Sequence, residues 1–215
     1  MLLFLSSATF ANAKEPAFQS KFNLTNVSFK SNQKASLSGV WCFNWAEFIE
    51  PHAVCSSSST SITLPSKWNK LTGEKSYPRQ GYASYSTTIT LPPNSPPLGL
   101  YVPLFYRAGE FFINGQSVLK VGQPSKSKEF ETPRDKRSVI VLPTDEQIIN
   151  LVIHVSSFHH IEGGVNNPLE VALLSDLQNE ERIRSFSSIF LVGSSLSFAV
   201  YFLFLGLGRV SKKDF

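Results

Sequence analysis

An uncharged run near the C-terminus constrains this chain more than any other feature. The 24 residues from Ser185 to Gly208 include no Asp, Glu, Lys or Arg. As a helix rising about 1.5 Å per residue, the run would extend about 36 Å, more than the roughly 30 Å of a bilayer's hydrocarbon core. A buried helix of a soluble domain is the alternative, but such a long helix normally keeps a polar face. We therefore predict a membrane-spanning helix over residues 186–208.

Charged residues flank the predicted span on both sides. A connector at residues 176–185 contains Arg182 and Arg184, and a short tail at 209–215 contains Arg209, Lys212 and Lys213. Basic residues collect on the cytoplasmic side of membrane helices, so we expect residues 209–215 to be cytoplasmic. Small residues within the span would let a second helix approach closely, which motivates a membrane-protein partner or a homodimer: Gly193, Ser194, Ser195, Ser197 and Ala199.

The N-terminus has the pattern of an export signal. Residues 2–10 are largely apolar, and Ala11-Asn12-Ala13 matches the small-x-small cleavage pattern. No Lys or Arg precedes the apolar part, which departs from the usual form, and a buried N-terminal strand is the alternative. We predict a signal peptide at residues 1–13, which places the following domain outside the cytoplasm.

The chain contains two cysteines, Cys42 and Cys55. In an oxidising compartment they are candidates for a disulfide that closes a short loop. Two free thiols, or a Cys42 packed inside a strand, are the alternatives. Their spacing is not C-x-x-C, so it does not support a redox or metal motif.

The segment between the two terminal features reads as β-structure. Trp41, Phe43 and Trp45 alternate within residues 37–45, and the alternation continues along residues 81–91. Asn114-Gly115 between two apolar runs at residues 110–121 indicates a hairpin. Further short strands are expected at residues 61–64, 98–104, 139–142, 148–155 and 169–174. Nine or ten short strands predict an antiparallel sandwich or jelly roll at residues 35–175, after an N-terminal extension at 14–34.

Several segments resemble known families. Leu37–Phe43 resembles the L-x-G-x-W-x-F strand that opens jelly-roll sugar-binding domains, and Leu64–Asn69 resembles their V-P-x-x-W-N segment. Val155–Gly164, followed by the apolar run and Lys212–Asp214, is similar to bacterial seven-transmembrane receptors with diverse intracellular signalling modules. This resemblance covers roughly residues 35–215. It implies an all-β, galactose-binding-like jelly roll in the periplasm, anchored in the bacterial inner membrane by a single C-terminal helix.

The chain departs from that family in one large respect. It ends at Phe215, after the first of the seven helices, so the resemblance carries over no signalling output. The function we expect is a membrane-anchored sensor or ligand-binding module of a signal-transduction receptor that lacks its output domain. The alternatives are a protein–protein interaction module and a non-functional remnant of a truncated receptor.

Two loop regions carry the residue types of a sugar site, which needs aromatic faces and hydrogen-bonding groups. The candidate ligand-binding residues are Trp68, Asn69, Tyr77, Arg79 and Tyr82 in the first region and His159, His160 and Glu162 in the second. Packing within the sandwich is the alternative for the aromatic residues. Adjacent histidines in an extended chain point in opposite directions, so a packed surface loop is the alternative to a metal site.

Other function classes find little support. The chain has no Gly-x-Ser-x-Gly elbow, no phosphate-binding glycine loop and no zinc-protease motif, so we expect no enzyme activity and no cofactor. Its Lys and Arg residues are scattered and its net charge is only +4, which argues against a nucleic-acid partner. The partners we expect are a carbohydrate or another small molecule and the membrane.

Overall fold

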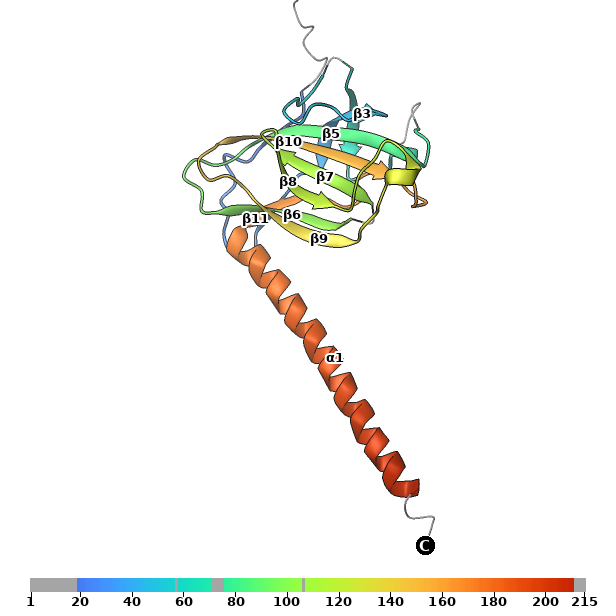
Figure 1. Cartoon of the computed structure of the whole chain (residues 1–215). Helices are drawn as coiled ribbons and strands as arrows, with labels where there is room; N and C mark the ends of the chain where they lie inside the picture. Colours follow the sequence, from blue (N-terminus) through green and yellow to red (C-terminus); the bar gives the residue numbers. More distant parts are fainter. Residues whose placement is uncertain (1–18, 57, 71–75, 106, 211–215) are drawn as a thin grey trace, which may run out of the picture.

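The computed structural model describes residues 19–56, 58–70, 76–105 and 107–210. Two β-sheets face each other, and a long helix leaves from the side of the second sheet (Figure 1). The first sheet has the strand order β4-β3-β5-β10-β7-β8, with β1 beside β5. Its strands are β1 (Lys21–Asn23), β3 (Gly39–Trp45), β4 (Thr60–Leu64), β5 (Gly81–Thr90), β7 (Ala108–Ile113), β8 (Gln116–Val121) and β10 (Ile148–Ser157).

The second sheet has the order β2-β11-β6-β9. Its strands are β2 (Lys34–Ser36), β6 (Leu98–Phe105), β9 (Lys136–Val141) and β11 (Glu170–Leu173). Neighbouring strands are antiparallel in both sheets, except that β1 runs parallel to β5. Two single-turn 3-10 helices, η1 (Trp68–Lys70) and η2 (Lys128–Phe130), lie in loops. The predicted antiparallel sandwich is confirmed, and each strand predicted from residue 37 onward is present, with ends that differ by a few residues from those predicted.

The core lies between the two sheets and follows the alternation of the sequence. Trp41, Tyr85 and Ile153 point inward from the first sheet, and Leu100 and Val171 point inward from the second. All five are fully buried, which is the result expected for strands with one face on the core. The predicted hairpin is also present, since β7 and β8 are joined at Asn114-Gly115, where both residues adopt positive φ.

The expected boundary between an extension and a domain at residue 34 is wrong. In the described part of that segment, β1 pairs with the C-terminal half of β5, and β2 pairs with β11. Phe22 and Val27 pack against the core. The N-terminal residues therefore form part of both sheets, although three-residue strands are too short to show a period in the sequence. The predicted signal peptide at residues 1–13 lies outside the described residues.

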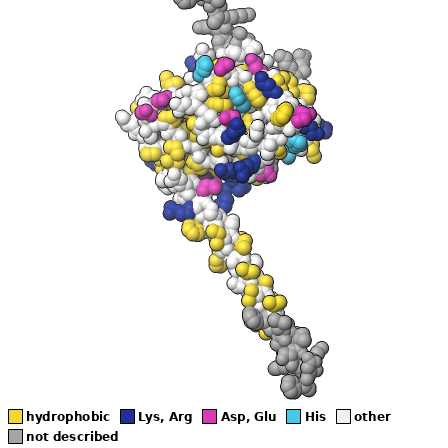
Figure 2. All heavy atoms as spheres, in the orientation of Figure 1, with side chains coloured by type: hydrophobic (Ala, Val, Ile, Leu, Met, Phe, Trp, Pro, Cys, Tyr) yellow, Lys and Arg dark blue, Asp and Glu magenta, His cyan; other side chains and the backbone are white. Residues whose placement is uncertain are grey.

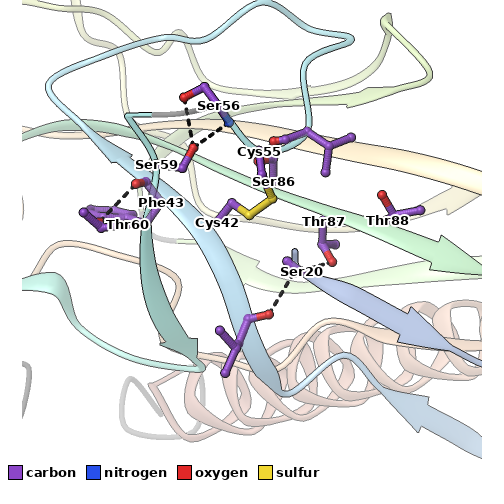
Figure 3. The surroundings of a disulfide bond; sticks show 12 residues. Ser20, Cys42, Phe43, Cys55, Ser56, Ser59, Thr60, Ser86, Thr87 and Thr88 are labelled. Carbon is purple, nitrogen blue, oxygen red and sulfur yellow. Dashed lines mark hydrogen bonds between the residues drawn. A yellow bond between two sulfur atoms is a disulfide. The ribbon is translucent and has the colours of Figure 1, made fainter. Parts of the chain in front are cut away.

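A disulfide holds the loop that covers the outer face of the first sheet. Cys42 of β3 is bonded to Cys55, with their Cα atoms 5.6 Å apart, so the candidate pairing is confirmed (Figure 3). The covering loop, residues 46–56, is also held by hydroxyl groups of β5. Ser84 donates a hydrogen bond to the Glu47 carbonyl at 2.7 Å, and Ser86 donates one to the Val54 carbonyl at 2.8 Å.

The helix α1 (Leu174–Val210) begins at the residue after β11, so no separate connector exists between sandwich and helix. The predicted connector is helical as expected, but it is continuous with the apolar segment. Leu177 is buried, with its side chain over Gly99 and close to Val139. A side chain at position 99 would meet Leu177 at 3.0 Å, so glycine allows the first turn to lie close to the sheet.

Polar contacts continue along one side of the helix, at positions four residues apart. The Asn32 amide donates a hydrogen bond to the Asp176 carboxylate at 2.7 Å, and the Lys34 ammonium pairs with Glu180 at 2.8 Å. The Lys34 ammonium also lies 5.3 Å from the ring centre of Tyr101. Residues at i and i+4 share one helix face, so these contacts attach the first turns of α1 to the second sheet.

Beyond these turns the helix projects away from the sandwich. Hydrophobic side chains line the described part of the projecting segment, and the charged side chains lie on the sandwich and the first turns (Figure 2). Residues Leu174–Leu203 form one helix that is long and apolar enough to cross a membrane. None of its most apolar window is buried within the chain. Exposed apolar surface of this extent is the property of a lipid-facing helix.

Candidate ligand-binding site

The two loop regions chosen from the sequence lie side by side in the structure. The Ser66 amide donates to the Val165 carbonyl at 2.9 Å, and the Trp68 amide donates to the Gly163 carbonyl at 3.1 Å. Segments about a hundred residues apart in the chain thus form one end of the sandwich. This end is remote from the helix, because β6 runs from Leu98, beside the start of α1, for about 23 Å to Phe105.

Trp68 is a core residue, so its predicted role as a ligand platform is wrong. Its side chain is fully buried, and its ring meets Trp45 edge-on at 5.2 Å. The indole N–H donates to the Arg79 carbonyl at 3.3 Å. A side chain at Gly163 would meet the indole at 1.9 Å, so this glycine is needed for the loop to close over the ring. A buried indole has no free face on which a sugar could stack.

The other aromatic candidates also pack within the domain. Tyr77 is half-buried, and its ring lies 5.0 Å from Trp45 and 5.1 Å from Phe43. Tyr82 lies on the outer face of the first sheet, where it meets Phe48 edge-on at 5.0 Å. The packing alternative therefore describes both residues better than a ligand-binding role.

The polar candidates of the first region differ in exposure. Arg79 is exposed, whereas Asn69 is half-buried. The Asn69 side-chain oxygen is buried and accepts no hydrogen bond from the described residues. Neither residue lines the pocket that the two loops form.

His159 and His160 diverge, as expected for neighbours in an extended chain. The His159 ring nitrogen lies 3.3 Å from the Lys128 carbonyl and 4.0 Å from the carboxylate of Glu131. His160 instead lines a pocket beside Glu162. Among the residues that the structure describes, no group of three His, Cys, Asp or Glu side chains is arranged to hold a metal ion.

Glu162 connects the two loop regions by charge. Its carboxylate pairs with the ammonium groups of Lys67 at 2.5 Å and Lys70 at 3.2 Å. The hydrogen bond from Lys67 is the main cause that holds the pKa of Glu162 below its ordinary value. Glu162 is therefore ionised at neutral pH, and two lysines surround its negative charge.

Arg107 is the site residue that sequence reasoning missed. Only 3% of its surface is exposed, and its Nε and Nη2 atoms donate to the Glu162 carbonyl at 2.9 and 2.8 Å. Burial lowers the pKa of Arg107 below its ordinary value, while the nearby Tyr85 and Glu162 oppose that shift. A sequence signal existed, because Arg107 is the one charge between the apolar runs of β6 and β7.

These residues surround a pocket of about 370 Å³, which we call the distal pocket. It is lined by Lys67, Arg107, His160, Glu162, Asn166 and Asn167. Two of the six are cationic, one is a histidine, two are amides, and one is an acid. The pocket thus offers many hydrogen-bond donors and a positive charge to a molecule of monosaccharide size.

Comparisons with known proteins identify the fold but not a family. No protein-family model matches the chain, and no curated protein matches it. Among solved structures, β-glucuronidase from Ruminococcus gnavus in complex with D-glucuronic acid aligns with 69% of this chain at 16% identity and a TM-score of 0.51. A β-glucuronidase from an uncultured Clostridium species aligns with 67% at 13% identity and the same TM-score.

The alignments cover only part of those enzymes. This chain spans 31% of the first and 29% of the second. At such low identity the likeness shows a shared β-sandwich fold alone. The resemblance to bacterial seven-transmembrane receptors is not tested by these comparisons and stays a prediction.

Proposed function

We propose that this chain is a membrane-anchored, extracytoplasmic ligand-binding module of the sensor type, with a galactose-binding-like jelly roll. The observation that carries the proposal is the distal pocket, which two distant loop segments form around a buried arginine. The same sandwich continues into an apolar helix without a break. A domain that binds a ligand at one end and continues into a membrane helix at the other has the arrangement of a sensor.

Location outside the cytoplasm is supported by independent features. Structural disulfides persist in oxidising compartments, and Cys42 and Cys55 form one here. The basic residues after the helix favour a cytoplasmic C-terminus. Both features agree with a periplasmic domain held by one span in a bacterial inner membrane, as the receptor resemblance implies. Pairing of the helix with a membrane-protein partner or a second copy also stays a prediction.

A carbohydrate is the ligand class that the lining residues favour. Asn166 and Asn167 supply amides, and Arg107 supplies donors that match the hydroxyl groups of a sugar. The sandwich fold is shared with part of two β-glucuronidases, one of them solved with D-glucuronic acid. Fold likeness is a weak basis for function, so the pocket carries more of the argument than the neighbours do.

Binding fits the distal pocket better than catalysis does. Most glycosidases use two carboxyl groups on either side of the scissile bond. The lining residues of the distal pocket include one carboxylate, Glu162, and two lysines engage it. We therefore propose a module that holds its ligand without cleaving it.

A binding screen with the full chain in detergent micelles tests the proposal. We expect saturable binding of at least one member of a glycan array, and Asn166→Arg should abolish it by filling the pocket. Lys21→Arg, on β1 and not among the lining residues, is the matched control that should bind normally. The proposal is wrong if the array yields no ligand, or if Asn166→Arg binds every ligand as the unmodified chain does.

A further inference from the structure

We propose that the ligand of the distal pocket is an acid, a sugar or sugar-like molecule whose carboxylate is bound by Arg107. This inference rests on the proposed binding function and adds to it the charge of the ligand. It follows from the burial of Arg107, the hydrogen bonds it makes, and the balance of charge around it.

The burial of Arg107 requires a compensating partner. Removing a guanidinium from water is costly unless the group is paired and hydrogen-bonded. Arg107 is 3% exposed, yet among the described residues no carboxylate oxygen lies within the 4.0 Å of an ion pair. Its one described acceptor is a neutral backbone carbonyl, that of Glu162. The charge of Arg107 is therefore only partly compensated by the chain.

The guanidinium also has unused donors. A guanidinium has five N–H groups in a planar fork. One from Nε and one from Nη2 point to the Glu162 carbonyl, which leaves about three for other acceptors. Arg107 lines the distal pocket, so these donors are available to a molecule within it. A carboxylate is the acceptor that matches such a fork with two parallel hydrogen bonds.

The carboxylate of Glu162 is not free to serve as that acceptor. It is held by Lys67 and Lys70, whose ammonium groups lie 2.5 and 3.2 Å from its two oxygens. Around the pocket, the positive charges of two lysines and one arginine thus outnumber the negative charge of one glutamate. The positive excess attracts an anion and would repel a cationic ligand.

Polar groups beside Arg107 suit the remainder of an acidic sugar. The Asn166 side-chain oxygen is buried and has no hydrogen-bond partner among the described residues. A ligand hydroxyl could donate to it, which would remove the cost of an unpaired buried acceptor. A volume of about 370 Å³ accommodates one sugar ring with its carboxylate.

A purely structural role for Arg107 is the competing interpretation. Its two bonds to the Glu162 carbonyl fasten residues 158–164 to the start of β7, and an arginine with that role alone would show no preference among ligands. Ligand discrimination therefore separates the two interpretations. A change in stability does not separate them.

The experiment is calorimetric titration of the full chain in detergent micelles with matched pairs: D-galacturonate against D-galactose, and D-glucuronate against D-glucose. We expect at least one acid to bind about tenfold or more tightly than its neutral partner, since a hydrogen bond between charged groups is stronger than one to a neutral group. Arg107→Met should remove that preference. Asn166→Asp keeps the side-chain shape and adds a negative charge, so it should weaken the binding of the acids more than that of the neutral sugars.

Controls make each outcome decisive. Arg134→Gln removes an exposed arginine and should bind as the unmodified chain does. If Arg107→Met does not fold, Asn166→Asp gives the answer alone. Equal binding of acid and neutral sugars overturns the acid inference and leaves the binding function in place. Absence of binding by all four compounds and by the glycan array overturns both.

Discussion

The outer faces of the two sheets are covered in different ways. On the first sheet, residues 46–56 form a covering loop with an apolar contact, in which Ile49 packs with Phe112 and Val152. A disulfide and the buried ring of His154, whose Nε2 lies 2.9 Å from the Ile49 carbonyl, hold that loop in place. On the second sheet, only the first turns of α1 lie against the strands, through buried Leu177 and the polar contacts of Asp176 and Glu180.

The two sheets thus differ in the kind of interaction that holds the segment on their outer face, covalent and apolar on the first and partly ionic on the second. A covalent bond and buried apolar contacts change little with salt, whereas exposed ion pairs are weak and screened. We therefore expect the attachment of residues 46–56 to the first sheet to be insensitive to salt. The contact between the second sheet and the helix relies in part on exposed polar pairs, which salt weakens.

The largest effect should follow loss of the disulfide. Replacing both cysteines, Cys42→Ala with Cys55→Ala, should lower the free energy of unfolding by about 2–4 kcal/mol, because the loop is no longer closed in the unfolded chain. Urea unfolding in detergent micelles, followed by tryptophan fluorescence, measures this. A reducing agent should reproduce the loss in the unmodified chain and have no effect on the variant. An unchanged urea midpoint in the double variant would show that the apolar contacts of Ile49 suffice to hold residues 46–56 on the sheet.

A smaller effect is expected at the buried leucine where α1 contacts the second sheet. Leu177→Ala should cost about 2–3 kcal/mol, near the low end for a buried leucine, because the site lies under a single helix rather than between the sheets. The same unfolding experiment measures it. Leu205→Ala, at an exposed position of the projecting helix, is the matched control and should leave the sandwich unaffected. Equal costs for the two variants would mean that α1 is not docked at Leu177.

The smallest effect should come from the polar contacts between α1 and the sandwich, in which Asn32 bonds to Asp176 and Lys34 pairs with Glu180. Lys34→Met keeps the apolar stem and removes the pair with Glu180, which should cost about 0.2–1 kcal/mol at low salt. Repeating the measurement in 1 M NaCl should remove most of the difference, because the Debye length falls to about 3 Å. Lys21→Met, on β1 of the other sheet, should show no comparable salt dependence. A cost that persists at high salt would mean that packing, and not charge, attaches the helix here.

The two loop segments of the candidate site were predictable from the sequence, but the residues that line the distal pocket were not. Residues 66–82 and 158–164 stood out by their residue types, and the structure brings Ser66–Lys70 against Glu162–Val165. Trp68 was misjudged because exposure of an aromatic ring depends on what closes over it, in this case Gly163. Arg107 was missed because its partner, the Glu162 carbonyl, is 55 residues away along the chain.

The amino-acid sequence by itself determined the strands, the hairpin at Asn114-Gly115, the candidate cysteine pair and the apolar helix. These features depend on periods of two residues, on turn chemistry and on run length, all of which act over a few neighbours. Only the tertiary structure decided that β1 and β2 join the two sheets, that α1 lies against Gly99, and that Arg107 is buried beside the distal pocket. Each of these depends on contacts between segments far apart in the chain, where burial and charge are set by the partner that folding supplies.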